Sequence, residues 1–151
     1  MPAKEKEGLE EAVSHLLEEC RMVLPGIQAL FGFQLVAVFN QRFGQLPFGD
    51  QVLHLVAVAF VAVSAALVMT PAAFHREVEP DSVSERMLNI STWLLLASMA
   101  FLALGIAGDF FIIAFLVLEN RLVPALAATL LFAILVLLWF IFPFCCAHTR
   151  R

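Results

Sequence analysis

The stretch that decides the fold runs from Glu18 to Gln34 and reads EECRMVLPGIQALFGFQ. It begins with charged residues and contains no charged residue after Arg21. A chain that passes from water into a lipid bilayer changes composition in this way, because the hydrocarbon core excludes charge. The stretch therefore predicts that the first membrane-spanning helix enters the bilayer here.

The composition of the whole chain agrees with a membrane location. Hydrophobic residues make up 62% of the 151 residues, and charged residues make up 15%. Soluble domains are typically about 45–50% apolar and about 25% charged. The formal net charge of -4 offers no basic surface to a nucleic acid. We therefore expect a single integral membrane domain over residues 1–151, with the lipid bilayer as its surroundings and no nucleic-acid partner.

Four apolar segments, separated by polar turns, predict four spans. They cover residues 24–39, 52–69, 87–118 and 123–142. The predicted fold class is all-α: a four-transmembrane-helix bundle with an N-terminal amphipathic helical extension. As a helix the third segment would be about 45 Å long, more than a hydrocarbon core of about 30 Å needs. It is therefore expected either to tilt or to break near Gly108 and Asp109, and Pro143 is expected to end the fourth span.

The N-terminal extension covers about residues 9–23, where apolar residues recur at helical spacing. They are Leu9, Val13, Leu16, Leu17 and Met22, with Cys20 beside them. Two interpretations are open: a helix that lies on the membrane surface, or an extension of the first span into the cytoplasm. The acidic face favours the extension, because it suits an anionic lipid surface poorly. Pro25 predicts a kink or break near Met22 to Leu24.

The distribution of Lys and Arg predicts the orientation in the membrane. Arg42 and Arg121 lie in turns on one side. The other seven lie on the opposite side: Lys4, Lys6, Arg21, Arg76, Arg86, Arg150 and Arg151. Both termini and the loop after the second span are therefore expected in the cytoplasm, and Trp93 and Trp139 fall toward the same interface.

The three cysteines, Cys20, Cys145 and Cys146, also lie near this face. Cytoplasmic thiols stay reduced, so we expect no disulfide. Together with His148, the two C-terminal cysteines supply too few ligands for a zinc site. No metal and no cofactor is predicted.

Small residues at helical spacing predict the faces on which helices pack, because they let two backbones approach closely. They are Ala62, Ala66 and Thr70 in the second span, Ser91, Ser98 and Gly105 in the third, and Ala125, Ala128, Thr129 and Ala133 in the fourth. Such seams serve packing either within one bundle or between copies of the chain. The sequence does not distinguish these two uses.

Charged residues gather near the cytoplasmic ends of the first two spans. Short connections favour neighbouring helices, so these ends are expected side by side. The predicted inner-rim cluster consists of Glu18, Glu19, Arg21, His75 and Arg76, and Glu18 can pair with Arg21 one turn along the helix. One interpretation is an ion-pair network that anchors the helices at the interface. The other is an inner gate or the mouth of a proton relay, in which His75 would exchange protons.

Polar residues also fall within the predicted spans: Gln28, Gln34 and Asp109. Polar side chains inside a membrane are costly unless they are paired or wetted, so each is a candidate site residue. Asp109 either binds a cation or carries a proton, or it is structural and pairs with Arg42 or Arg121 or caps a restarted helix. His54, near the outer end of the second span, is expected in an interfacial role.

The chain contains no phosphate-binding loop, catalytic triad order, pair of metal-binding carboxylates or redox motif, so we do not expect an enzyme. Two hypotheses about function remain. The first is a homo-oligomeric protein that translocates cations or protons. The second is an accessory or scaffold subunit that packs against a larger membrane complex through its small-residue seams and Phe-rich faces.

Three motifs resemble those of a known family. They are Arg21-x-x-x-Pro-Gly26-x-Gln28-x-Leu30-Phe31-x-Phe33, Phe39-x-x-Arg42-Phe43 and Thr70-Pro71-x-x-x-His75-Arg76. Over most of the chain, the sequence resembles the small bacterial four-span membrane proteins of unknown function whose members are often labelled sodium:proton antiporters. The resemblance implies four spans in a bacterial inner (cytoplasmic) membrane and an exchange of cations and protons.

Overall fold

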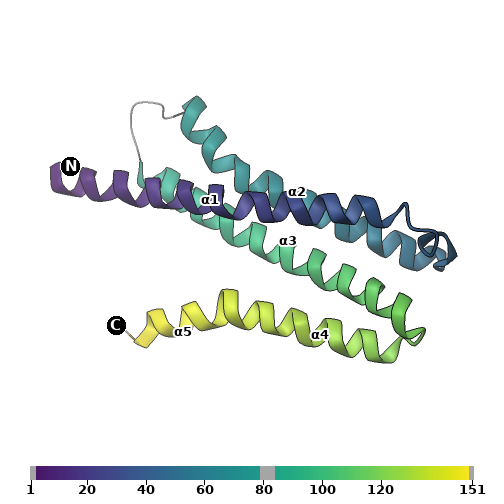
Figure 1. Cartoon of the computed structure of the whole chain (residues 1–151). Coiled ribbons are helices and arrows are strands. Elements are labelled where there is room, and N and C mark those ends of the chain that lie inside the picture. Colours follow the sequence, from purple (N-terminus) through teal and green to yellow (C-terminus); the bar gives the residue numbers. More distant parts are fainter. Residues whose placement is uncertain (1–2, 79–83, 150–151) are drawn as a thin grey trace.

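The computed structural model describes residues 3–78 and 84–149, and this part of the chain is helical apart from short turns (Figure 1). The long helices are α1 (Ala3–Ala37), α2 (Phe48–Val78), α3 (Glu85–Leu118) and α4 (Leu122–Val136). The remaining elements are a 3-10 turn, η1 (Phe43–Gln45), a π-helical turn, η2 (Leu137–Ile141), and α5 (Phe142–Thr149). Four helical stretches are long and apolar enough to cross a membrane: Gly8–Ala37, Phe48–Val78, Glu85–Leu118 and Leu122–Cys146. The predicted all-α four-helix bundle is confirmed.

The prediction near Met22 to Leu24 was a kink or a break, and the break is wrong, because α1 is one uninterrupted helix. Pro25 lies inside α1, where it cannot donate the backbone hydrogen bond that the carbonyl of Arg21 would accept. Both residues face outward, and membrane helices tolerate a proline when the structure around it does not clash. The amphipathic segment is therefore an extension of the first span.

The interior is built by α1, α2 and α3. Its hydrophobic cluster contains Leu16, Cys20 and Ile27 of α1, Val61 and Val68 of α2, and Leu95 of α3. The amphipathic segment also buries Leu9 and Val13, as its spacing predicted. Met22 departs from that pattern, because it is 75% exposed. The extension thus belongs to the packed bundle through one narrow face.

α2 and α3 form the most extensive helix pair, and Gly105 explains their close approach. A Cβ atom at this position would lie 2.6 Å from Cγ2 of Val61 and 3.1 Å from the carbonyl oxygen of Ala57. Ser91 and Ser98 are buried on the same helix. The small-residue seam predicted for the third span therefore faces into the bundle.

Apart from Ala128, the seams predicted for the second and fourth spans do not pack within the described chain. Their exposed members are Ala62, Ala66, Thr70, Ala125, Thr129 and Ala133. The buried face of α2 instead carries Ala57, Val61, Ser64 and Val68, and Ala57 and Val61 lie against Gly105 of α3. On α4 the buried residues are Pro124 and Ala128.

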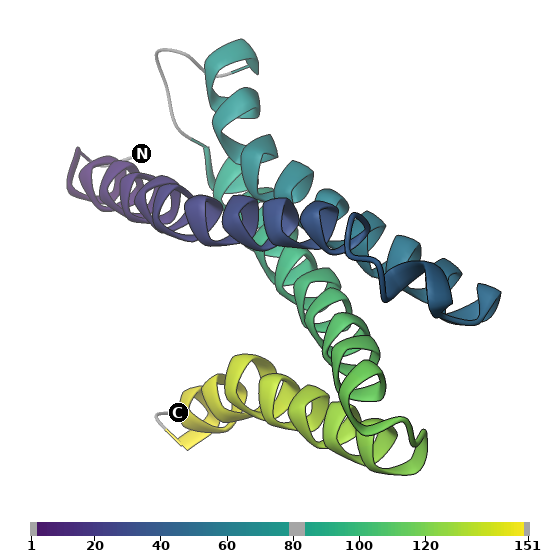
Figure 2. The ribbon, with the colours of Figure 1, turned by 45° about the vertical axis from the view of Figure 1, so that its right-hand side comes forward.

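α4 packs mainly on α3 and diverges from it away from the turn that joins them (Figure 1; Figure 2). An apolar hollow of about 710 Å³ separates η2 and α5 from α3, with Trp93 and Trp139 among its lining residues. The fourth span is therefore the least enclosed part of the bundle.

Two further predictions about the helix ends are resolved. α3 runs through Gly108 and Asp109 without interruption, so the alternative of a break there is wrong. The predicted stop at Pro143 is wrong, because the helix continues to Thr149. The π-helical turn η2 directly precedes α5 and changes the register of the backbone hydrogen bonds. This change lets the helix continue through Pro143, which has no backbone N–H to donate.

Candidate functional site

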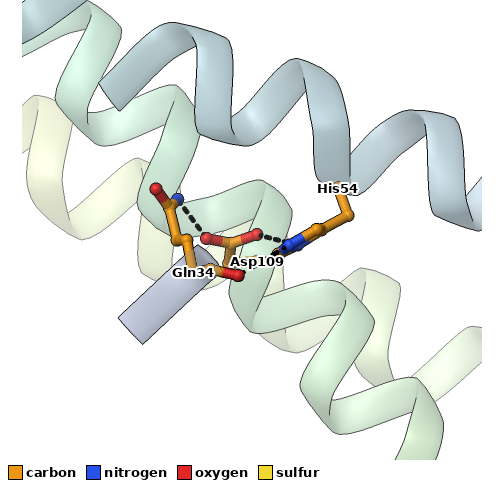
Figure 3. A network of polar contacts seen from close by, with 3 residues as sticks. All are labelled: Gln34, His54 and Asp109. Carbon is orange, nitrogen blue, oxygen red and sulfur yellow. Dashed lines mark hydrogen bonds and ion pairs between the residues drawn. The ribbon is translucent and has the colours of Figure 1, made fainter. Parts of the chain in front are cut away.

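Three polar residues from three helices meet inside the bundle (Figure 3). Their helix positions put them toward the end that carries the α1–α2 and α3–α4 turns. Gln34 lies in the last turn of α1, His54 in the second turn of α2, and Asp109 in the last third of α3. Because consecutive helices run in opposite directions, these positions fall at one level of the bundle. Their exposed fractions are only 4%, 5% and 7%.

Hydrogen bonds connect the three residues, which we call the Asp109 cluster. Oδ1 of Asp109 lies 2.9 Å from Nδ1 of His54, and Oδ2 accepts a hydrogen bond from Nε2 of Gln34 (Figure 3). The second ring nitrogen of His54, Nε2, lies 3.1 Å from the backbone carbonyl oxygen of Gln34. The imidazole also packs edge-on against Phe43, with 5.1 Å between ring centroids. The cluster therefore ties the ends of three helices together.

The partners of His54 determine how many protons the cluster holds. A backbone carbonyl oxygen only accepts hydrogen bonds, so Nε2 carries a proton. A second proton lies between Nδ1 and the carboxylate of Asp109. Whether that proton is on the ring or on the carboxyl group, the pair is neutral overall: imidazolium with carboxylate, or imidazole with carboxylic acid. Net neutrality matters here, because an uncompensated charge is expensive in a low-dielectric interior.

A second polar pair lies nearer the helix ends. Nη2 of Arg121 lies 2.9 Å from Oδ2 of Asp50, and its guanidinium carbon lies 5.1 Å from the ring centroid of Phe115. The Arg121 side chain is 61% exposed, whereas that of Asp50 is 7% exposed. Asp50 precedes His54 by four residues on α2, which is about 6 Å along the helix axis. This pair places the polar edge of the bundle one helical turn from the Asp109 cluster.

A cavity of about 340 Å³ adjoins the cluster. Gln34, His54 and Asp109 contribute to its wall, and Asn40 and Arg42 contribute from the turn after α1. The rest of the lining is apolar: Leu30, Phe33, Ala37, Phe43, Ile112, Ile113, Leu116 and Val117. A mainly apolar cavity with a few convergent polar groups is the usual form of a small-molecule site.

The structure corrects the predicted surroundings of Asp109. In one of the alternatives Asp109 would pair with Arg42 or Arg121, but Arg121 pairs with Asp50 and Arg42 lies in the turn region of the cavity. Its actual partners are Gln34 and His54, and the predicted interfacial role of His54 is wrong, because the ring is buried. Gln28, the other predicted intramembrane polar residue, is exposed on α1.

The sequence contained a signal that would have found the missing partner. Gln34, His54 and Asp109 all lie near the span ends on the same predicted side of the membrane. His54 also stands three residues before Ala57 and seven before Val61, so it shares their helix face. A polar residue on the packing face of an apolar helix must find a partner among its neighbours.

The residues of the predicted inner-rim cluster are brought together only in part. Arg21 and His75 line one hollow between α1 and α2, so the middle of α1 lies beside the C-terminal part of α2. Nδ1 of His75 is buried there without a hydrogen-bond partner. The expected ion pairs between the helices are absent from the described residues.

The remaining rim residues pair within their own helices. Glu18 lies 3.9 Å from His15, in place of the predicted pair with Arg21. Arg76 lies 3.5 Å from its neighbour Glu77, and Glu19 is exposed. Helical neighbours satisfy these charges more readily than residues across the gap.

The fold and the site together define the class: a polytopic membrane protein whose bundle encloses a carboxylate–imidazole–amide cluster. The model of a family of unknown function, DUF6328, matches residues 3–143, and the chain belongs to this family. No curated protein and no solved structure matches the chain.

Proposed function

We propose that the protein moves protons, or exchanges protons for small cations, across the membrane at the Asp109 cluster, without enzymatic chemistry. The observation that carries the proposal is the pair of acceptors that His54 contacts, a carboxylate and a backbone carbonyl. Ionisable residues within membrane-spanning segments are rare and are typical of ion and proton pathways.

The geometry supports a simple cycle of charge. The second proton can shift between Nδ1 of His54 and Oδ1 of Asp109 without changing the net charge of the pair. Release of that proton toward the cavity would leave the cluster with one negative charge. A small cation could then restore neutrality against the oxygens of Asp109 and Oε1 of Gln34, which has no other partner. Proton and cation would therefore occupy the site in turn.

The setting of the cluster supports a homo-oligomer. On the side away from the turns, the cluster is followed by tightly packed residues, with Val61 and Ala103 fully buried and Gly105 against Val61. A single copy thus offers no open path along the α2–α3 seam, whereas the exposed small residues of α2 and α4 suit contacts between copies. The Lys and Arg distribution supports cytoplasmic termini, and the resemblance noted above supports a bacterial inner membrane.

Flux measurements on reconstituted protein test the proposal. Liposomes with a trapped pH-sensitive dye would contain the wild type, Asp109→Asn or the matched control Asp50→Asn, and would be given a proton gradient and then a sodium gradient. We expect Asp109→Asn to fall to the rate of empty liposomes while Asp50→Asn retains transport, because only Asp109 shares a proton with His54. Equal flux through wild type and Asp109→Asn would reject the proposal.

The divergence of α4 favours a second candidate, an accessory subunit of a larger membrane complex. The distal part of the fourth span leaves a wide apolar hollow against α3, which a helix of another protein could fill. Gentle purification followed by native mass determination separates the two candidates. A discrete homo-oligomer supports transport, and stable recovery with one larger assembly supports the subunit.

A further inference from the structure

We infer that the cavity beside Asp109 binds a lipid-soluble small molecule whose buried end is an uncharged hydrogen-bond donor, such as the hydroxyl group of a phenol or an alcohol. The inference rests on the cavity and on unmet hydrogen-bond acceptors. It does not depend on ion movement, so the two proposals can fail separately.

The shape of the cavity determines the route of entry. Its volume of about 340 Å³ lies within the range of known ligand pockets. Two of its lining residues, Phe33 and Ile113, are 75% and 60% exposed on the outside of the bundle. The cavity therefore opens sideways between α1 and α3, toward the apolar surroundings that these helices require. A ligand that enters this way must be soluble in lipid.

The polar wall determines which end of the ligand is buried. The amide of Gln34 turns its NH₂ group toward Asp109, because carboxylate oxygens accept, and its Oε1 is left buried without a partner. Each oxygen of Asp109 is engaged in one hydrogen bond and has a further lone pair. Both ring nitrogens of His54 are already engaged. At the buried end of the cavity the unmet capacity is therefore acceptor capacity, and it calls for a donor, whereas Asn40 and Arg42, which can donate, belong to the exposed turn.

The charge balance excludes an ionic head group. The His54–Asp109 pair is already neutral, so a charged group buried beside it would have no counter-charge. Arg42, the charged residue of the turn that contributes to the wall, is itself exposed. An uncharged donor satisfies the acceptors without adding charge to the interior.

A matched pair of photoreactive probes tests the inference. The first is a 4-alkylphenol with a diazirine in its alkyl chain, and the second is the methyl ether of the same compound, which has no donor. Protein in lipid nanodiscs would be irradiated with each probe, and labelled residues would be located by mass spectrometry. We expect saturable labelling within 30–43 and 109–117, about 2- to 10-fold stronger for the phenol, which is the range that one hydrogen bond supplies. Equal or non-saturable labelling by both probes would overturn the inference.

Two substitutions sharpen the result. In Asp109→Leu the carboxylate acceptors are removed while the apolar walls remain, so both probes should still label but the phenol should lose its advantage. Ala37→Trp places a large side chain at the cavity wall and should abolish the saturable labelling, whereas Val38→Trp, at a neighbouring position that does not line the cavity, should leave it unchanged. A phenol preference that persists in Asp109→Leu, or saturable labelling that survives Ala37→Trp, would place the binding elsewhere and reject the site.

Discussion

Nδ1 of His54 lies 2.9 Å from Oδ1 of Asp109, although 55 residues separate them in the chain. The contact joins the beginning of α2 to the last third of α3, and Gln34 of α1 completes it from the other side. In a membrane interior each of these polar groups is costly unless it has a partner. Each of the three helices therefore depends on the other two to satisfy its buried polar side chain.

We expect His54→Leu to lower the free energy of unfolding by about 3–5 kcal/mol, because it leaves the carboxylate of Asp109 buried without its ionic partner. Unfolding in mixed micelles of mild and denaturing detergent measures this loss. The double variant His54→Leu/Asp109→Leu should recover a large part of it, since both polar groups are then gone. Additive losses in the double variant would show that the two residues are not coupled.

Gly105→Ala should destabilise the bundle by about 1–3 kcal/mol, the usual cost of overpacking. The added methyl group would lie 2.6 Å from Cγ2 of Val61 and 3.1 Å from the backbone oxygen of Ala57. Separation of α2 from α3 should also weaken the contact between His54 and Asp109. The same detergent titration measures the stability.

Two controls identify the cause of that effect. Val61→Ala combined with Gly105→Ala removes the nearest clashing atom and should be less harmful than the sum of the two single changes. Gly32→Ala adds a methyl group where no atom lies within 4 Å, so it should be neutral or stabilising by up to about 1 kcal/mol. If Gly32→Ala were as harmful as Gly105→Ala, close approach of α2 and α3 would not be the explanation.

Arg121→Gln should cost about 1 kcal/mol, because the Arg121 side chain is largely exposed and water screens its pair with Asp50. The loss should shrink as salt is added, because salt screens exposed charges. The stability difference between wild type and variant, measured at low and high ionic strength, checks this. Thermal scans that give the same difference at every salt concentration would argue instead that stacking of Arg121 on Phe115 dominates.

The seam on α4 should mediate contact between copies of the chain. After the three native cysteines are replaced, Thr129→Cys should form an intermolecular disulfide in native membranes under mild oxidation. Leu130→Cys, which is equally accessible on the neighbouring face, should cross-link less. Cross-linking that is equal at both positions, or absent from both, would count against this interface.

The number of spans followed from the sequence because hydrocarbon thickness imposes a length and a composition that are readable without any tertiary contact. The seam on α3 was readable for a similar reason, since Ser91, Ser98 and Gly105 are small residues on one face. The faces of α2 and α4 were not readable. Their orientation depends on which residues of the partner helix they meet, and in the structure Gly105 of α3 meets Ala57 and Val61 of α2.

The candidate site was readable only in part. Gln34 and Asp109 were identified from their cost in a membrane, whereas His54 was assigned to the interface because its depth depends on where α2 begins. α2 begins at Phe48, four residues before the predicted span. That shift places Asp50 at the polar edge and His54 one turn inside. Distances of one helical turn decide such assignments, and hydropathy does not resolve them.

All three members of the Asp109 cluster precede Leu118, the last residue of α3. If the helices insert in chain order, Gln34 and His54 therefore enter the membrane before their carboxylate partner does. They become fully satisfied when the third helix inserts, and the fourth helix adds nothing to the cluster itself. The least stable stage of insertion would thus fall between the second and third helices, when the His54 imidazole is in the bilayer without Asp109.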